Sequence, residues 1–135
     1  MKAHLTRRYI FSASHRLHSD SLTPEENRTV YGKCNNPYGH GHNYALEVTV
    51  SGQVDAATGM VCNLVDLDAA VRNEVLDRFD HVNLNLRPEL DAEVPTTENL
   101  SEVIFQILKQ SFKHAHLEKV RLEETAKNSF EYDGN

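Results

Sequence analysis

The 135-residue sequence is poor in cysteine, glycine and proline, and no apolar run approaches the length of a membrane span. Its two cysteines, Cys34 and Cys62, stand in different contexts. A disulfide stays open, but two free thiols in a reducing compartment are the favoured interpretation. The residues after Met1 lack a signal-peptide core. These features predict one cytoplasmic domain over 1–135, long enough to bury a core without staples.

Basic residues are also scarce relative to acidic ones. The formal net charge is -6 with histidine counted as neutral, which argues against non-specific binding of nucleic acid or membranes. Any anionic ligand must therefore be held by a local basic cluster. Histidine, by contrast, is abundant, with eight residues in this short chain.

Hydrophobic periodicity predicts two strands, two helices and two strands. Alternation indicates strands over 5–13 and 43–51, and two short strands at about 117–125 and 129–132. Helical spacing indicates a helix from Asp66 or Asp68 to about Phe79. A second helix is expected to begin near Thr96-Thr97. The predicted apolar stripes are Leu67, Ala70, Val71, Val75 and Phe79, and Leu100, Val103, Ile104, Ile107 and Leu108.

The segment 14–39 is a long connection in which Thr23-Pro24-Glu25-Glu26 has the form of a capping box. A short helical turn is expected there, inside a loop long enough to be functional. The order β-β-α-α-β-β predicts an α+β fold, with an antiparallel sheet and both helices on one face. Such a sheet leaves edge strands exposed, so oligomerisation through the edges is expected.

Three histidines form the candidate metal site. His40 and His42 lie in Gly39-His40-Gly41-His42, at the start of a predicted strand. Side chains at i and i+2 of a strand point to the same side, roughly 6.6 Å apart. If the first two strands pair antiparallel, His15 lies beside them. Three histidines without an obvious fourth ligand are typical of a catalytic zinc site with an open position.

An isolated His-x-His is more often chance, and His114-Ala115-His116 has the same spacing. That pair stands where the second helix should end, where a cation is favourable, and is interpreted as solvated and non-ligating. The first pair differs from it by its strand context, its flanking glycines and a third histidine within reach.

Several further groups are candidates for proton transfer. Cys34 stands in a polar loop and is interpreted as a fourth ligand, a catalytic base or a bystander. Asp80-His81 follows the first predicted helix. The simple interpretation is a helix-end histidine; the alternative is that Asp80 orients His81 for proton transfer.

Glu124 follows Val120 and Leu122 at a spacing of two, so it is expected on the apolar face. A carboxylate there is costly unless it is paired. A ligand edge with two donors, such as the 2-amino and N3-H groups of a pterin, would satisfy it. A register shifted by one residue would place Glu123 inside instead.

These residues resemble the 6-pyruvoyltetrahydropterin synthase family over nearly the whole chain. The segments that carry the resemblance are Phe11-Ser-Ala-Ser-His15-Arg16-Leu17, Gly32-Lys-Cys34-Asn-Asn-Pro-Tyr-Gly-His40-Gly-His42-Asn-Tyr44, Phe79-Asp80-His81-Val-Asn-Leu, Pro95-Thr-Thr-Glu-Asn99 and Glu124-Thr125. The Cys-x5-His-Gly-His element is the most specific of them.

The resemblance implies a tunnelling fold, in which three subunits join their sheets into a barrel and two trimers stack into a homohexamer. It implies 7,8-dihydroneopterin triphosphate as the substrate. It also implies a lyase reaction of tetrahydrobiopterin biosynthesis, which eliminates triphosphate and yields 6-pyruvoyltetrahydropterin without an external redox cofactor.

Residue roles follow from the same resemblance. His15, His40 and His42 would hold Zn²⁺, and Cys34 would remove a proton from the substrate side chain. Asp80 and His81, from a neighbouring subunit, would complete proton transfer. Glu124 would anchor the pterin, with Thr96 and Thr97 beside it. Charge and nearness to the metal loop make Arg16, His18 and Lys33 the candidate triphosphate contacts.

Two other functions remain open. 6-Carboxytetrahydropterin synthase resembles this family in fold, metal and substrate but releases acetaldehyde, and its cysteine usually stands closer to the His-x-His. The longer spacing from Cys34 to His40 favours the pyruvoyl product. The alternative of another class is a non-catalytic zinc- or pterin-binding module, against which the joint presence of Cys34, Asp80 and His81 argues.

Overall fold

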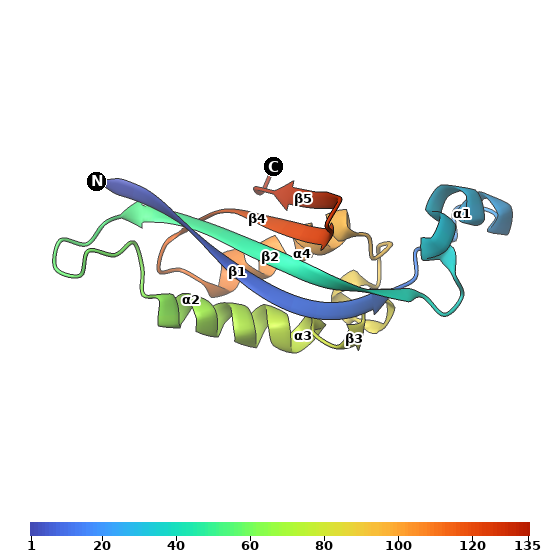
Figure 1. The fold of residues 1–135 in the computed structure, drawn as a ribbon, viewed down its shortest axis with the longest axis horizontal. Helices are drawn as coiled ribbons and strands as arrows, with labels where there is room; N and C mark the ends of the chain where they lie inside the picture. Colours follow the sequence, from blue (N-terminus) through green and yellow to red (C-terminus); the bar gives the residue numbers. More distant parts are fainter.

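The computed structural model describes residues 1–135, and a five-stranded sheet carries the fold (Figure 1). The strands lie in the order β3-β1-β2-β4-β5. Their bounds are β1 (Lys2–His15), β2 (His40–Gln53), β3 (Val82–Asn83), β4 (His116–Thr125) and β5 (Asn128–Tyr132). The helices are α1 (Pro24–Tyr31), α2 (Leu64–Val71), α3 (Asp77–Phe79) and α4 (Thr97–Ser111).

The longest feature of the sheet is the antiparallel ladder between β1 and β2. It runs without interruption from the pair Lys2 and Gln53 to the pair His15 and His40. Both strands are longer than their apolar alternation predicts, because backbone hydrogen bonds continue the pairing past the buried stretch. The extra length places His15 and His40 inside the sheet rather than in loops.

The first long helix begins earlier than predicted. Its N-cap is Asn63, whose side-chain oxygen accepts a hydrogen bond from the amide of Val65 at 2.9 Å, rather than Asp66 or Asp68. The Asp68 carboxylate instead accepts hydrogen bonds from Arg7 and Tyr9 on β1. A five-residue π-helical segment, Arg72–Leu76, joins α2 to α3, so the helical path continues to Phe79.

The other predicted helix starts agree with the structure. Thr96 caps α4 by accepting a hydrogen bond from the amide of Asn99. Thr23 and Glu26 form the reciprocal capping box of α1, with Pro24 in its first turn. The connection 14–39 is therefore more ordered than expected, since a 3₁₀ helix, Gly32–Asn35, follows α1 directly.

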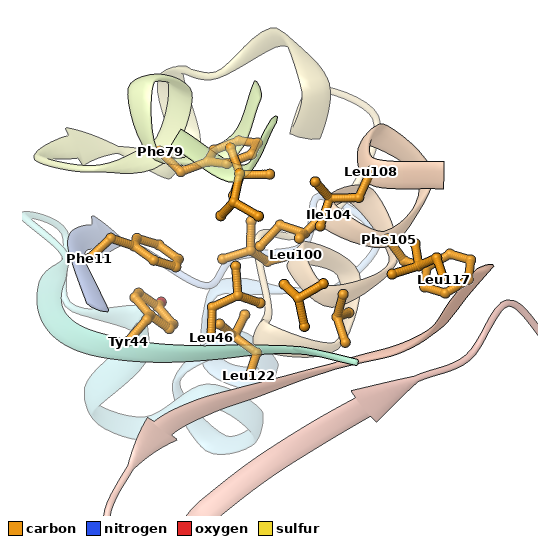
Figure 2. Packing of buried hydrophobic residues seen from close by; sticks show 14 of the residues in the cluster. Phe11, Tyr44, Leu46, Phe79, Leu100, Ile104, Phe105, Leu108, Leu117 and Leu122 are labelled. Carbon is orange, nitrogen blue, oxygen red and sulfur yellow. The ribbon is translucent and has the colours of Figure 1, made fainter. Parts of the chain in front are cut away.

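The core lies between one face of the sheet and the layer formed by α2, α3 and α4 (Figure 2). The first predicted helix, which corresponds to α2 and α3, and the second, α4, therefore cover the same face of the sheet, as predicted. The stripe residues Leu67, Val71, Phe79, Leu100 and Ile104 are fully buried. Phe11 and Tyr44 stack with ring centroids 5.0 Å apart beneath the helices, close to the end of the sheet that carries the histidines.

One strand was not predicted. β3 is two residues long, too short for a hydrophobic pattern, and it pairs parallel to β1 at Ala13 and Ser14. The sheet is therefore mixed rather than wholly antiparallel. The rest of β1 has an unpaired edge, and β5 forms the opposite edge. No helix combines the length and the apolar character that crossing a membrane requires.

Candidate metal centre and active site

His15, His40 and His42 meet at one end of the sheet. The pairing of β1 with β2 sets His15 directly opposite His40, and His42 follows two residues later on the same face. The ring centroid of His15 lies 5.1 Å from the ring centroid of His40 and 5.1 Å from that of His42. The centroids of His40 and His42 are 4.6 Å apart. The strand pairing thus brings the three predicted ligands together.

The hydrogen bonding of this cluster leaves nitrogen atoms free for a ligand. His15 is 1% exposed, and its Nδ1 lies 2.9 Å from the Pro95 carbonyl oxygen. A carbonyl only accepts, so Nδ1 carries the proton and Nε2 keeps a lone pair. The Nε2 atoms of His15 and His42 are buried without a hydrogen-bond partner. Because unpaired buried polar atoms are costly, these two nitrogen atoms are suited to bind a ligand.

Electrostatics favours the neutral form that binds metal. Burial lowers the pKa of His15 and of His42 below the usual value for histidine. The carboxylate of Glu124 acts in the opposite direction, since its Oε1 lies 3.3 Å from His42 Nε2 and 3.7 Å from His15 Nε2. Burial outweighs this attraction, so both rings are neutral at neutral pH and able to bind a divalent cation.

Glu124, rather than Glu123, faces the cluster. In the β4–β5 pairing Glu123 stands opposite Ser129 and Thr125 opposite Asn128, so Glu124 is the extra residue of a bulge, which re-aims its side chain. Asn128 Nδ2 donates to Glu124 Oε2 at 3.1 Å and leaves Oε1 towards the histidines. Glu123 lies 3.6 Å from Arg8 on the other face.

Cys34 adjoins the same cluster. Its Sγ lies 3.2 Å from His40 Nε2. Its carbonyl accepts a hydrogen bond from the Leu17 amide at 2.7 Å, which ties the loop to the end of β1. Burial and the negative charge of Glu124 raise the pKa of the thiol. Two overlapping sets of ligand atoms have metal-site spacing: His15, Cys34 and His40, and His15, His42 and Glu124.

Of the two glycines that flank His40, only Gly39 is required by the geometry. It has a φ of +72°, and a Cβ there would lie 2.7 Å from the His15 carbonyl oxygen. A Cβ at Gly41 would meet only an ordinary contact at 3.6 Å. Gly39 therefore allows the Cys34 loop to approach β1 closely.

Asp80 and His81 lie apart from this cluster within the chain. Asp80 Oδ1 is 2.8 Å from His81 Nδ1 and accepts a hydrogen bond from the Ser12 amide at 2.9 Å, so it orients the ring. The His81 side chain is 82% exposed and has a positive φ of 59°. It lines a shallow cavity of about 420 Å³ together with residues of β1, β2 and β3, among them His42, and its only ion pair is with Asp80.

The remaining predicted contacts differ in their surroundings. Thr96 is occupied in the cap of α4, whereas Thr97 is 2% exposed and its hydroxyl has no partner. Arg16 Nε donates to the Asn35 carbonyl at 3.2 Å. Lys33 is exposed, and His18 Nε2 lies 3.3 Å from the solvated Asp20.

The histidine pair His114 and His116 lies outside the cluster, and both residues are exposed, as expected. The reason differs from the one predicted. Helix α4 ends at Ser111, and His116 begins β4, so neither residue belongs to a helix terminus.

Sequence reasoning missed three groups at the site. Tyr44 is fully buried, and its hydroxyl lacks a hydrogen-bond partner although the ring packs against His42. The spacing of two from His42 could have indicated it. The Pro95 carbonyl and the Asn128 side chain carry no local signal, because only tertiary structure brings them to His15 and Glu124.

Fold and site together define an α+β protein with three histidines, a carboxylate and a thiol gathered at one end of a sheet. Residues 4–135 match the family described as 6-pyruvoyl tetrahydropterin synthase. The chain belongs to this enzyme family.

Named relatives cover nearly the whole chain. The 6-pyruvoyl tetrahydrobiopterin synthase of Poecilia reticulata is 47% identical, over 97% of this chain and 90% of that protein. The one of Homo sapiens is 46% identical, over 98% and 92%. The structure of Caenorhabditis elegans 6-pyruvoyl tetrahydropterin synthase matches with a TM-score of 0.95 and 42% identity, covering 100% of this chain and 97% of that one.

Proposed function

We propose that this chain is a cytoplasmic zinc-dependent lyase that converts 7,8-dihydroneopterin triphosphate into 6-pyruvoyltetrahydropterin and eliminates the triphosphate. The observation that carries the proposal is the pair of buried, partnerless Nε2 atoms of His15 and His42 beside His40. The names of the relatives support the reaction. Both cysteines are free thiols, which agrees with a reducing compartment.

The donor set fits zinc. Neutral imidazoles are preferred zinc ligands, and the hydrogen bond from His15 to Pro95 is the kind of outer contact that fixes a ligating ring. His15, His40 and His42 would hold the ion. A bound zinc ion would polarise the oxygens of the substrate side chain and lower the pKa of its hydroxyls.

Cys34 is the proposed base that takes a proton from the substrate side chain, a role for which a bound zinc ion would have to favour the thiolate against burial and the charge of Glu124. Its sulfur lies beside His40 at the wall of the cluster, within reach of a molecule held by the three histidines. The same position also suits a fourth metal ligand, because His15, Cys34 and His40 form one of the two ligand sets. Zinc content of a Cys34 variant separates these roles.

Asp80 and His81 are proposed to act in the active site of a neighbouring subunit. His81 is oriented by Asp80 and is mostly exposed, yet it has no ion pair with the histidine cluster of its own chain. An imidazole held in one orientation towards solvent is suited to a site completed by another copy. The unpaired edge of β1 and the edge strand β5 offer the surfaces for a trimer, and two trimers would stack into the hexamer.

Glu124 is the proposed pterin anchor. Its free Oε1 would accept from the donor edge of the ring while Asn128 holds Oε2, and the partnerless hydroxyl of Thr97 offers a further contact. Arg16, His18 and Lys33 are the proposed contacts of the triphosphate. The short distance from Glu124 to His42 also suits metal binding, so zinc content and KM of a Glu124 variant must be measured together.

The test is product analysis. Zinc-loaded protein is incubated with 7,8-dihydroneopterin triphosphate, with metal-free protein as the control, and the products are identified by mass. The proposal predicts triphosphate and 6-pyruvoyltetrahydropterin from the loaded protein alone. Acetaldehyde with a 6-carboxy product would refute it in favour of the carboxy synthase, and binding without turnover would indicate a non-catalytic module.

A further inference from the structure

A second group of metal-ligand side chains lies on the opposite face of the sheet, towards its other end. The register pairs His4 of β1 with Ser51 of β2, and Ser51 with His116 of β4. These three residues therefore form a row across three strands, with a small side chain between two imidazoles. Both β1 and β2 keep an unbroken alternation from this row to the histidine cluster, so the two groups face opposite sides.

A bulge brings a carboxylate into this row. Thr49 pairs with Lys119 and Val50 pairs with Leu117, so Glu118 is an extra residue in β4. Bulges re-aim a side chain and are enriched beside functional sites. Glu118 Oε1 accepts a hydrogen bond of 2.6 Å from the Ser51 hydroxyl, which holds the carboxylate over the middle of the row.

The ligand atoms converge on this carboxylate. The Nε2 atoms of His4 and of His116 each lie 3.8 Å from Glu118 Oε1. Two ligands of one tetrahedral zinc ion, each bound at 2.0–2.1 Å, stand about 3.4 Å apart. The two imidazoles are 59% and 71% exposed, so their side chains are free to turn towards an ion bound by Glu118, and water can complete the coordination.

We infer that His4, Glu118 and His116 form a second binding site for a divalent transition-metal ion such as Zn²⁺. Two imidazoles and one carboxylate are an established ligand set for zinc. The competing arrangement is a carboxylate shared between two protonated histidines. A metal ion instead binds both rings in their neutral form, so its binding is expected to weaken as the pH falls.

The chain contains a matched control for this site. His114 is two residues from His116 and is also exposed, but its ring packs against Phe112, with centroids 5.5 Å apart. The sequence alone gives no reason to expect different roles for His114 and His116. Only the strand register distinguishes them, because it sets His116 opposite Ser51 and in line with His4.

The test is zinc binding by the whole 135-residue chain already loaded with one equivalent of zinc. Equilibrium dialysis against rising Zn²⁺ should show a second equivalent per chain with micromolar affinity. His116→Gln or Glu118→Gln should weaken the second equivalent about tenfold or more, while the first equivalent and turnover stay unchanged. His114→Gln should bind like the wild type, and circular dichroism confirms that each variant is folded.

Two results would overturn the inference. One is uptake of a single equivalent by the wild type at every zinc concentration that keeps the protein in solution. The other is an equal loss in His114→Gln and His116→Gln, which would indicate non-specific surface binding. Because turnover is measured separately, failure of this site leaves the proposed lyase activity standing, and absence of turnover leaves this site testable.

Discussion

Acidification of the metal-free protein should destabilise it in a window set by the buried histidines. Burial holds the pKa of His15 and of His42 below the ordinary value of 6.5. Below that value the unfolded chain binds protons at these positions and the native chain does not. The free energy of unfolding therefore decreases as the pH falls. The contribution of the two neutral imidazoles to it is complete only above about pH 6.5.

The size of the effect follows from proton counting. Each proton taken up only by the unfolded chain lowers the free energy of unfolding by about 1.4 kcal/mol per pH unit. Two such imidazoles give a slope of up to about 2.7 kcal/mol per pH unit between about pH 6.5 and their folded pKa values. Carboxylates whose pKa is lowered, such as Asp68, contribute only at more acidic pH, because the ordinary pKa of aspartate is already 3.8.

The assay is urea unfolding in the presence of a chelator, at a series of pH values between about 7.5 and 5.5. His15→Gln should reduce the slope of unfolding free energy against pH by about 1.4 kcal/mol per pH unit, the contribution of one proton. His114→Gln, which changes an exposed residue, should leave the slope unchanged. A flat profile, or a protein that becomes more stable on acidification, would show that the buried imidazoles are protonated in the native state. That result would mean that Glu124 holds protons on the native imidazoles.

Three further substitutions test individual side chains. Cys34→Ala should keep one equivalent of zinc and lose about 10²–10⁴-fold in turnover, and loss of that zinc would make Cys34 a ligand. Tyr44→Phe removes a buried hydroxyl whose geometry towards Thr97 falls short of a hydrogen bond, so unfolding should cost about 1 kcal/mol more, a melting shift of about 3–4 °C. A lower melting temperature would mean that the two hydroxyls do bond. Glu124→Gln should raise KM, whereas the matched Glu123→Gln should leave kinetics unchanged, and equal effects would contradict the assigned register.

Local sequence patterns were sufficient to predict the helix caps and the pairing of the first two strands, because these features depend on residues close together in the sequence. Thr23 and Thr96 are followed by the residues that helix caps need, and both caps form. The alternation of β2 and the position of His15 after the first strand were enough to predict that the histidines meet, because antiparallel pairing of consecutive strands is the simplest connection.

Features that depend on distant partners were not predictable. Asp68 has the residue type of a helix cap, but it is recruited by Arg7 and Tyr9 on β1, and Asn63 caps the helix instead. The two-residue β3 is too short to leave a pattern. The bulge at Glu118 likewise has no local signal, since it arises from the register of β4 against β2.

A crystal structure of the zinc-loaded protein, with an anomalous difference map at the zinc edge, would show whether the three histidines bind one ion. We expect a peak about 2.0–2.1 Å from one ring nitrogen each of His15, His40 and His42, with a water molecule or substrate oxygen completing the coordination. A map without density among these three rings would contradict this expectation. So would an ion enclosed by four protein ligands, because no position would remain for the substrate.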